Sequence, residues 1–196
     1  IRDRTNVLQT LPKDGHPMDW LSVGIQTLGM LETTDNWRED SLNLIARMPR
    51  LMGLIFRYRE GREADIAADD TSKSLVQRFV DTVGVDEHLR AKMERVVSTY
   101  LVLHMDHGGG NLSTFTGKSI ASGKATVYSA IAGAMNALSG PLHGRANQSC
   151  LEFVLKIGTS DEAEVEQFVR NELKEGRPVF GFGHAVLSVE DPRATA

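Results

Sequence analysis

Four of the six histidines lie in or close to glycine-rich segments: His104, His107, His143 and His184. Glycine lets the backbone approach a ligand closely. Histidine is the side chain best suited to exchanging protons near neutral pH. This combination predicts proton-transfer chemistry on a bound small molecule.

The first of these segments runs from His104 to Asn111 and contains three consecutive glycines. His104 and His107 are three residues apart, but the i,i+4 pair with an intervening glutamate that is typical of zinc sites is absent from this segment. The N–H groups of a glycine turn, and of a helix beginning at Asn111, would favour a carboxylate or a phosphate. The alternative is that both histidines cap carbonyl groups at the end of the preceding helix.

The second segment places His143 between Pro141 and Gly144, where the sequence predicts the beginning of another helix. A helix N-terminus disfavours positive charge, so we expect a neutral imidazole that can polarise a carbonyl by donating a hydrogen bond. The alternative is a histidine at a helix N-cap that has no chemical role.

The third segment, Gly181 to Arg193, places His184 after two glycines. Its Gly-x-Gly pattern does not open a nucleotide-binding helix. Arg193 could hold a carboxylate through two parallel hydrogen bonds, or form a surface salt bridge with Asp191. Cys150, the single cysteine, excludes an intramolecular disulfide and a multi-cysteine zinc site, and we expect it to be a small core residue.

These residues must be positioned by helices, because hydrophobic residues recur with helical spacing along nearly the whole chain. This pattern predicts an all-α fold. The first helix is expected near Pro17, and the second, from about Trp37 to Arg59, is expected to kink or break at Pro49. The small residues of the segment Ala125–Leu138 favour close helix packing. Further helices are expected over residues 73–83, 86–105, 111–122, 125–138, 143–157 and 161–174, and loops over 61–72 and 177–196, with at most one short hairpin.

Composition narrows the functional classes further. The chain has 196 residues, and its 22 basic and 26 acidic side chains give a net charge of −4. A mildly acidic chain is a poor candidate for binding nucleic acid or an anionic membrane by bulk charge. A hydrophobic fraction of 41% is typical of a globular protein. No apolar run approaches the roughly 18 residues of a membrane span. A single cysteine suits a reducing compartment.

Taken together, these segments resemble the citrate synthase family. The family's HPM helix start is matched at residues 16–18, and its HxDHEGGN turn resembles HMDHGGGN at 104–111. Its GPLHGxAN signature resembles GPLHGRAN at 140–147, and GYGHAVxxxxDPR resembles GFGHAVLSVEDPR at 181–193. The motifs follow the family's order. Their residues are more similar to those of the dimeric type of citrate synthase than to those of the hexameric bacterial type.

The resemblance implies a multi-helical, two-domain homodimer that condenses acetyl-CoA with oxaloacetate to give citrate and CoA, without a permanently bound cofactor or metal. Residues 1–143 would belong to the large domain, and residues 144–196 would begin the small domain. By motif, His143 would donate a hydrogen bond to the enol or enolate oxygen of acetyl-CoA. His184 would polarise and protonate the carbonyl of oxaloacetate.

The same resemblance implies the binding residues. His107 and Arg193 would hold the oxygens of oxaloacetate, and Asn111 would support His143 or the glycine turn. CoA would lie against Pro178, Val179, Phe180, Gly181, Phe182 and Gly183.

Three positions depart from the family pattern. Gly108 replaces a glutamate, Phe182 stands where tyrosine is common, and Arg145 adds a positive charge after the GPLHG core. The family's catalytic aspartate and two further substrate-binding arginines follow the DPR segment and fall beyond this sequence. The chain is therefore expected to be a fragment that has no useful catalysis by itself.

Several alternatives stay open. A 2-methylcitrate synthase, which takes propionyl-CoA, and an enzyme of the citryl-CoA lyase type would carry the same motifs. From another class, the chain could be a non-catalytic helical binding or oligomerisation module that uses the segment Ala125–Leu138. Bacterial cytoplasm or the mitochondrial matrix would be the compartment, with the cytoplasm favoured.

Overall fold

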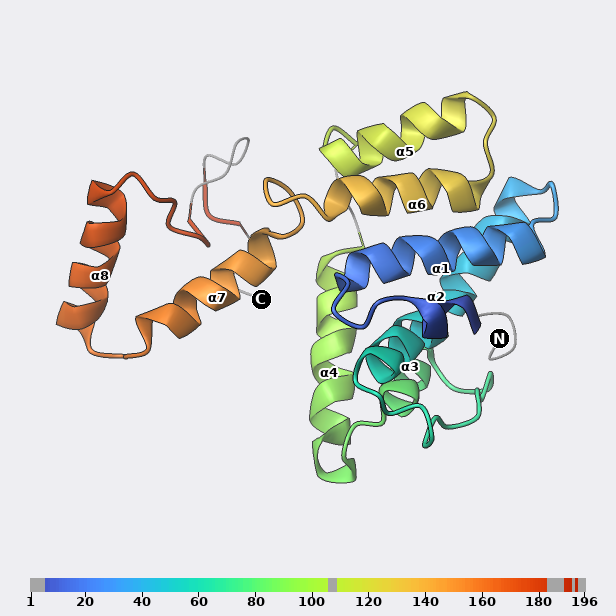
Figure 1. Ribbon diagram of the computed structural model, residues 1–196, viewed down its shortest axis with the longest axis horizontal. Coiled ribbons are helices and arrows are strands. Elements are labelled where there is room, and N and C mark those ends of the chain that lie inside the picture. Colours follow the sequence, from blue (N-terminus) through green and yellow to red (C-terminus); the bar gives the residue numbers. More distant parts are fainter. Residues whose placement is uncertain (1–5, 106–108, 183–188, 192, 194–196) are drawn as a thin grey trace. The chain divides into compact units, whose positions relative to one another are not determined.

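A computed structural model describes residues 6–105, 109–182, 189–191 and 193 of the chain. Within these ranges every regular element is a helix, which confirms the all-α prediction. None of the described helices is long and apolar enough to cross a bilayer. After a short 3-10 turn at Asn6–Thr10 the α-helices are α1 (Pro17–Glu32), α2 (Trp37–Arg59), α3 (Leu75–Val83), α4 (Glu87–Leu103), α5 (Leu112–Ser122), α6 (Val127–Leu138), α7 (Ala146–Ile157) and α8 (Glu162–Lys174) (Figure 1).

The chain divides into two compact units, Ile1–Leu138 and Ser139–Ala196. Helices α1 to α6 belong to the first unit, and α7 and α8 belong to the second. The division into a large and a small domain at residues 143 and 144 stays a prediction.

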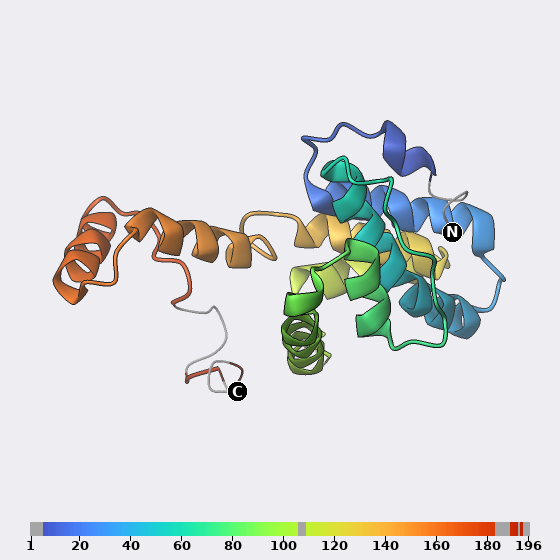
Figure 2. The same ribbon diagram turned by 90° about the horizontal axis from the view of Figure 1, so that it is seen from below.

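In the first unit, α6 packs against both α1 and α5, while α2 packs against α1 and α3 (Figures 1 and 2). Helix α4 packs on α3, but none of its residues is buried. The core of this unit lies mainly between α1, α2 and α6. Its fully buried large side chains include Trp20, Ile25, Leu28, Leu51, Leu54, Tyr58 and Tyr128.

Small residues allow the helices of this core to approach closely, as expected for the segment Ala125–Leu138. Ala130, Ala132 and Ala134 are buried in α6. A Cβ atom on Gly29 of α1 would lie 2.5 Å from the Cβ of Tyr128 in α6. At such a contact the absence of a side chain sets the distance between the two helices.

Helix α2 is continuous from Trp37 to Arg59, so of the kink or break expected at Pro49 the break is wrong. Proline removes one backbone hydrogen bond from a helix interior. Pro49 itself is buried, and buried Leu44 and Leu54 on either side hold both halves of the helix in the core. The tertiary packing therefore outweighs the local preference of proline.

The second unit is built on α7 and α8, which meet through aromatic rings. Phe153 of α7 and Phe168 of α8 pack edge to face, with ring centroids 5.6 Å apart. Asp161 caps α8, its side chain accepting a hydrogen bond from the Glu164 N–H at 3.0 Å. The helix ends at Lys174, and Gly176 follows with a φ of +69°. These ends agree with the predicted helix over 161–174.

Candidate active site

The glycine turn leads into α5 through Asn111, which is the N-cap of this helix, so α5 begins within one residue of its predicted start. Its side-chain oxygen accepts hydrogen bonds from the Thr114 N–H at 2.9 Å and from the Ser113 hydroxyl at 2.7 Å. Lys118 reaches back from α5 and donates to the Gly109 carbonyl at 3.4 Å. The printed contacts of the Asn111 side chain thus lie within the first turn of α5, and its proposed role in supporting His143 or the glycine turn stays a prediction.

His104, at the end of α4, has a structural role among the described contacts. Its Nδ1 lies 2.8 Å from the Tyr100 carbonyl, and its ring stacks on the Tyr100 ring with centroids 4.1 Å apart. This agrees with a helix-end histidine whose side chain contacts one of the last carbonyl groups of its own helix. Across the described ranges, histidine, cysteine, aspartate and glutamate side chains do not gather in threes that could hold a metal ion.

His143 lies in a turn rather than at the beginning of a helix. Its N–H donates to the Gly140 carbonyl at 3.0 Å, and its own carbonyl accepts from the Ala146 N–H at 3.3 Å. Helix α7 begins at Ala146, so the expected helix start at His143 is wrong by three residues. The influence of a helix terminus is confined to its first turn. The helix N-terminus that was expected at His143 lies instead at Ala146.

The segment that follows Pro178 lines an apolar hollow in the second unit. The cavity measures about 630 Å³ and lies between α7, α8 and the part of this segment from Val179 onward. Phe180 packs edge to face on Phe153, with centroids 6.5 Å apart. Gly181 has a φ of +92°, and a Cβ there would lie 3.1 Å from the Cys150 sulfur. Cys150 is half-buried rather than a core residue, and it supports the segment from α7.

Charged side chains gather where this segment leaves α8. Glu172 is 5% exposed, and its carboxylate accepts two hydrogen bonds from Arg177, at 2.8 and 2.6 Å, and one from Lys156 at 3.3 Å. The hydrogen bonds from Arg177, helped by that from Lys156, outweigh the effect of burial and lower the pKa of Glu172 to about 2. The carboxylate is thus strongly held in its charged form.

Arg193 forms an ion pair with Asp191. Its Nε donates to the two carboxylate oxygens at 2.9 and 3.0 Å, and its Nη2 donates to one of them at 2.5 Å, so the guanidinium already makes a forked contact. This is the surface salt bridge that the sequence offered as the alternative to substrate binding. A role for Arg193 in holding a carboxylate stays a prediction, and such a ligand would compete with Asp191.

The predicted site residues that the structure describes are divided between the two units. His143, Arg193 and Pro178–Phe182 belong to the second unit, whereas Asn111 belongs to the first. His107, His184 and Gly183 lie outside the described residues, and their assignments remain predictions. The sequence analysis missed the charged cluster of Lys156, Glu172 and Arg177. No motif could have revealed it, because 16 residues separate Lys156 from Glu172.

Comparison with known proteins places the chain among related sequences. The family profile described as citrate synthase, C-terminal domain, matches residues 2–196. The mitochondrial citrate synthase of Tetrahymena thermophila is 32% identical over 98% of this chain and 45% of its own length. The mitochondrial 2-methylcitrate synthase of Yarrowia lipolytica is also 32% identical, over 97% of this chain and 44% of its own. The chain spans about half the length of the curated relatives it matches.

A solved structure extends the comparison to the fold. The citrate synthase of Thermoplasma acidophilum, determined as a ternary complex with carboxymethyl coenzyme A and oxaloacetate, is 25% identical to this chain. The match has a TM-score of 0.84 and covers 100% of this chain and 51% of the other. The helical arrangement described above is therefore that of half a citrate synthase chain.

Proposed function

The chain belongs to the citrate synthase family, and from this premise we propose that its residues form part of a site that joins the acetyl group of acetyl-CoA to oxaloacetate. The observation that carries the proposal is the fold match, over the whole chain, to a citrate synthase solved with carboxymethyl coenzyme A and oxaloacetate. The products would be citrate and free CoA.

The chemistry explains the residue types. The methyl carbon of the thioester loses a proton and attacks the keto carbon of oxaloacetate, whose oxygen gains a proton. Hydrolysis of the resulting thioester releases CoA. Negative charge develops first on the thioester oxygen, so a donor aimed at that oxygen lowers the barrier. His143 would provide this donor, and His184 would polarise and protonate the keto group.

The remaining residues would bind and orient the substrates. His107 and Arg193 would hold the oxygens of oxaloacetate, and Asn111 would fix the turn between α4 and α5. The hollow beside Val179–Phe182 is lined almost entirely by apolar side chains. Such a surface suits the aliphatic part of CoA, which supports the assignment of residues 178–183 to CoA binding.

Substrate binding is the direct test of this proposal. We expect isothermal titration with oxaloacetate to detect binding to the 196-residue chain, and binding to weaken in His107→Ala and Arg193→Ala. Two matched controls are His88→Ala, an exposed histidine on α4, and Arg170→Ala, an exposed arginine on α8. Affinities unchanged in both site variants would overturn the oxaloacetate assignment.

Turnover is a separate measurement. Release of the CoA thiol from acetyl-CoA upon addition of oxaloacetate, lost in His143→Ala, would show that the 196 residues suffice for catalysis. The motifs carried by this chain do not supply the family's aspartate base, so we expect substrate binding with little or no turnover. A folded chain that binds neither oxaloacetate nor CoA would instead favour the non-catalytic helical module.

A 2-methylcitrate synthase is the second candidate. The observation that favours it is the relative from Yarrowia lipolytica, which is as similar to this chain as the citrate synthase from Tetrahymena thermophila. Where turnover is measurable, the ratio of kcat/KM for acetyl-CoA and propionyl-CoA separates the two. A ratio in favour of propionyl-CoA would assign the chain to the second candidate.

A further inference from the structure

We propose that Glu172 is a positioning residue for the CoA-binding segment, because its ion pair with Arg177 fixes the chain where it enters residues 178–182. This inference rests on the proposed function, since the assignment of the segment to CoA comes from there. Neither Glu172 nor Arg177 is proposed to contact substrate. Their effect would pass through the backbone of the segment.

Two independent links join Glu172 to Arg177. The first is in the backbone: the Arg177 N–H donates to the Glu172 carbonyl at 2.9 Å, and the Gly176 N–H donates to the Leu173 carbonyl at 3.0 Å. With Gly176 at a φ of +69°, these bonds form a Schellman motif that ends α8. The second link is the forked side-chain pair between the same two residues.

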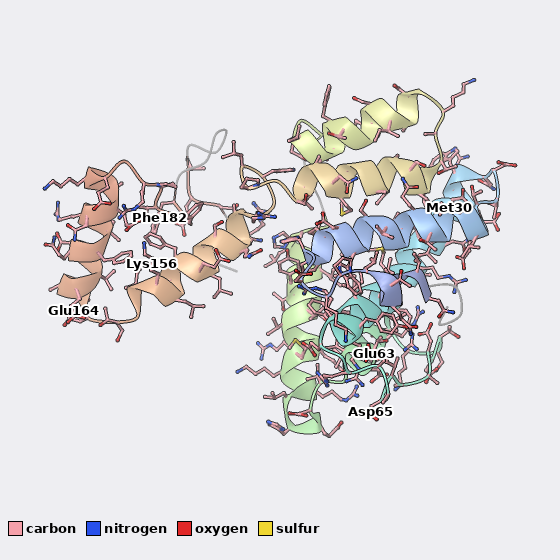
Figure 3. All side chains as sticks on the ribbon, in the orientation of Figure 1. Met30, Glu63, Asp65, Lys156, Glu164 and Phe182 are labelled. Carbon is pink, nitrogen blue, oxygen red and sulfur yellow. The ribbon has the colours of Figure 1, made fainter. Side chains whose placement is uncertain are left out.

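The carboxylate is also connected to the other helix of the unit. Lys156 points from α7 towards α8 (Figure 3) and donates to Glu172 at 3.3 Å. Its ammonium group lies 5.3 Å from the centre of the Phe168 ring. Glu172 therefore receives hydrogen bonds from α7 and from the residue that precedes the segment. A buried carboxylate with two cationic donors fixes all three parts relative to one another.

The segment follows immediately. Pro178, next to Arg177, restricts the backbone at the first position of the segment. Phe180 then packs on Phe153, and Gly181 takes a φ of +92° against Cys150. A displacement at Arg177 would therefore be transmitted through few rotatable bonds to the residues that line the apolar hollow. The charged cluster lies at the start of the segment, and the residues that follow Pro178 line the hollow.

The test compares Glu172→Gln with Glu166→Gln in the same 196-residue chain. Glutamine keeps the size of the side chain and removes its charge. Glu166 also lies on α8 and pairs with an arginine, Arg170, but both side chains are more than half exposed. We expect Glu172→Gln to accelerate amide hydrogen exchange at Gly176 and Arg177, whose N–H groups are hydrogen-bonded at the entry to the segment, and to weaken binding of coenzyme A, titrated calorimetrically, about tenfold. Glu166→Gln should change neither measurement.

A second pair of variants separates positioning from a loss of folding. Arg177→Met removes the forked partner and leaves Glu172 paired with Lys156, whereas Arg177→Lys keeps a charge but loses the fork. We expect Arg177→Met to resemble Glu172→Gln, and Arg177→Lys to fall between it and the unchanged chain. Far-ultraviolet circular dichroism identifies any variant that loses its helices, and the conclusion then comes from the variants that remain folded.

The outcomes distinguish this inference from the proposed function. If the unchanged chain binds no coenzyme A, the proposed CoA site fails, and hydrogen exchange alone decides whether Glu172 positions the segment. If the unchanged chain binds coenzyme A, but Glu172→Gln and Arg177→Met match Glu166→Gln in exchange and affinity, the positioning role is overturned and the CoA site stands.

Discussion

Gly29 and Tyr128 are in direct contact where α1 crosses α6: a Cβ atom added to Gly29 would lie 2.5 Å from the Tyr128 Cβ. A real Cβ atom essentially never approaches another atom so closely, and the Tyr128 Cβ moves only with its own helix. Tyr128 is fully buried in the core of the first unit. The spacing of these two helices therefore depends on a hydrogen atom at position 29.

Substitution of this glycine is expected to destabilise the chain. Alanine gains roughly 1 kcal/mol of helix propensity, but overpacking of a tight core costs about 1–3 kcal/mol, and a contact at Cβ leaves little room to relax. We expect Gly29→Ala to lower the free energy of unfolding by about 1–2 kcal/mol, measured by urea titration of tryptophan fluorescence. Gly24→Ala should cost less, because its nearest atom is Cδ1 at the far end of the Leu51 side chain, at 2.7 Å. An equal or greater loss in Gly24→Ala would contradict this account.

Asn111 allows its helix-capping role to be separated from its proposed role near the substrate. Asn111→Ala removes the acceptor for the Thr114 N–H and should cost about 1 kcal/mol of stability. Asn111→Asp keeps a capping oxygen and should be close to neutral in stability. Its added negative charge would weaken oxaloacetate binding if the glycine turn faces the substrate. Thermal unfolding and oxaloacetate titration of both variants test this, and an unchanged affinity in Asn111→Asp would leave Asn111 with the cap alone.

Gly181 combines two constraints that can be tested against a matched glycine. Its φ of +92° disfavours any other residue, and an added Cβ would lie 3.1 Å from the Cys150 sulfur. Gly176 also has a positive φ, of +69°, but a Cβ there would meet no atom within 4 Å. We expect Gly181→Ala to weaken coenzyme A binding about tenfold, and Gly176→Ala to affect it less. Calorimetric titration of both variants provides the measurement, and equal affinities would argue against a role for the contact with Cys150.

Glu172 is expected to make the second unit sensitive to acid. Hydrogen bonds from Arg177 and Lys156 lower its pKa from 4.5 to about 2 in the folded chain, so the folded chain binds this proton more weakly than the unfolded chain does. The ion pair therefore stabilises the folded state fully above the ordinary pKa of 4.5, and this contribution is lost as the pH falls from there towards 2.

The measurement has to report on the second unit alone, because both tryptophans, Trp20 and Trp37, lie in the first. Amide signals of α8, followed by nuclear magnetic resonance during urea titrations at several pH values, meet this need. In the unchanged chain, we expect the urea concentration at the midpoint of α8 unfolding to decrease as the pH is lowered below about 4.5. In Glu172→Gln this decrease should be less steep. The same pH dependence in both chains would show that other carboxyl groups cause the acid sensitivity.

The sequence by itself determined the helical class and most helix ends, because these depend on local chemistry. Helices α5 and α8 begin within one residue of their predicted starts, where Asn111 and Asp161 cap them, since a side-chain oxygen beside free N–H groups acts within a few residues. The motif segments likewise depend on residue types at short spacing. They were sufficient to identify the family before any contact was known.

Tertiary structure decided the features in which distant residues compete with local preference. Pro49 stays inside a continuous helix because the residues around it are buried, and α7 begins at Ala146 because His143 and its neighbours form a turn. The pairing of Glu172 with Lys156 and Arg177 joins α7, α8 and the segment beyond. Helical periodicity indicates which face of each helix is apolar, but not which helix it meets. Only packing in three dimensions could therefore reveal this cluster or the contact between Gly29 and Tyr128.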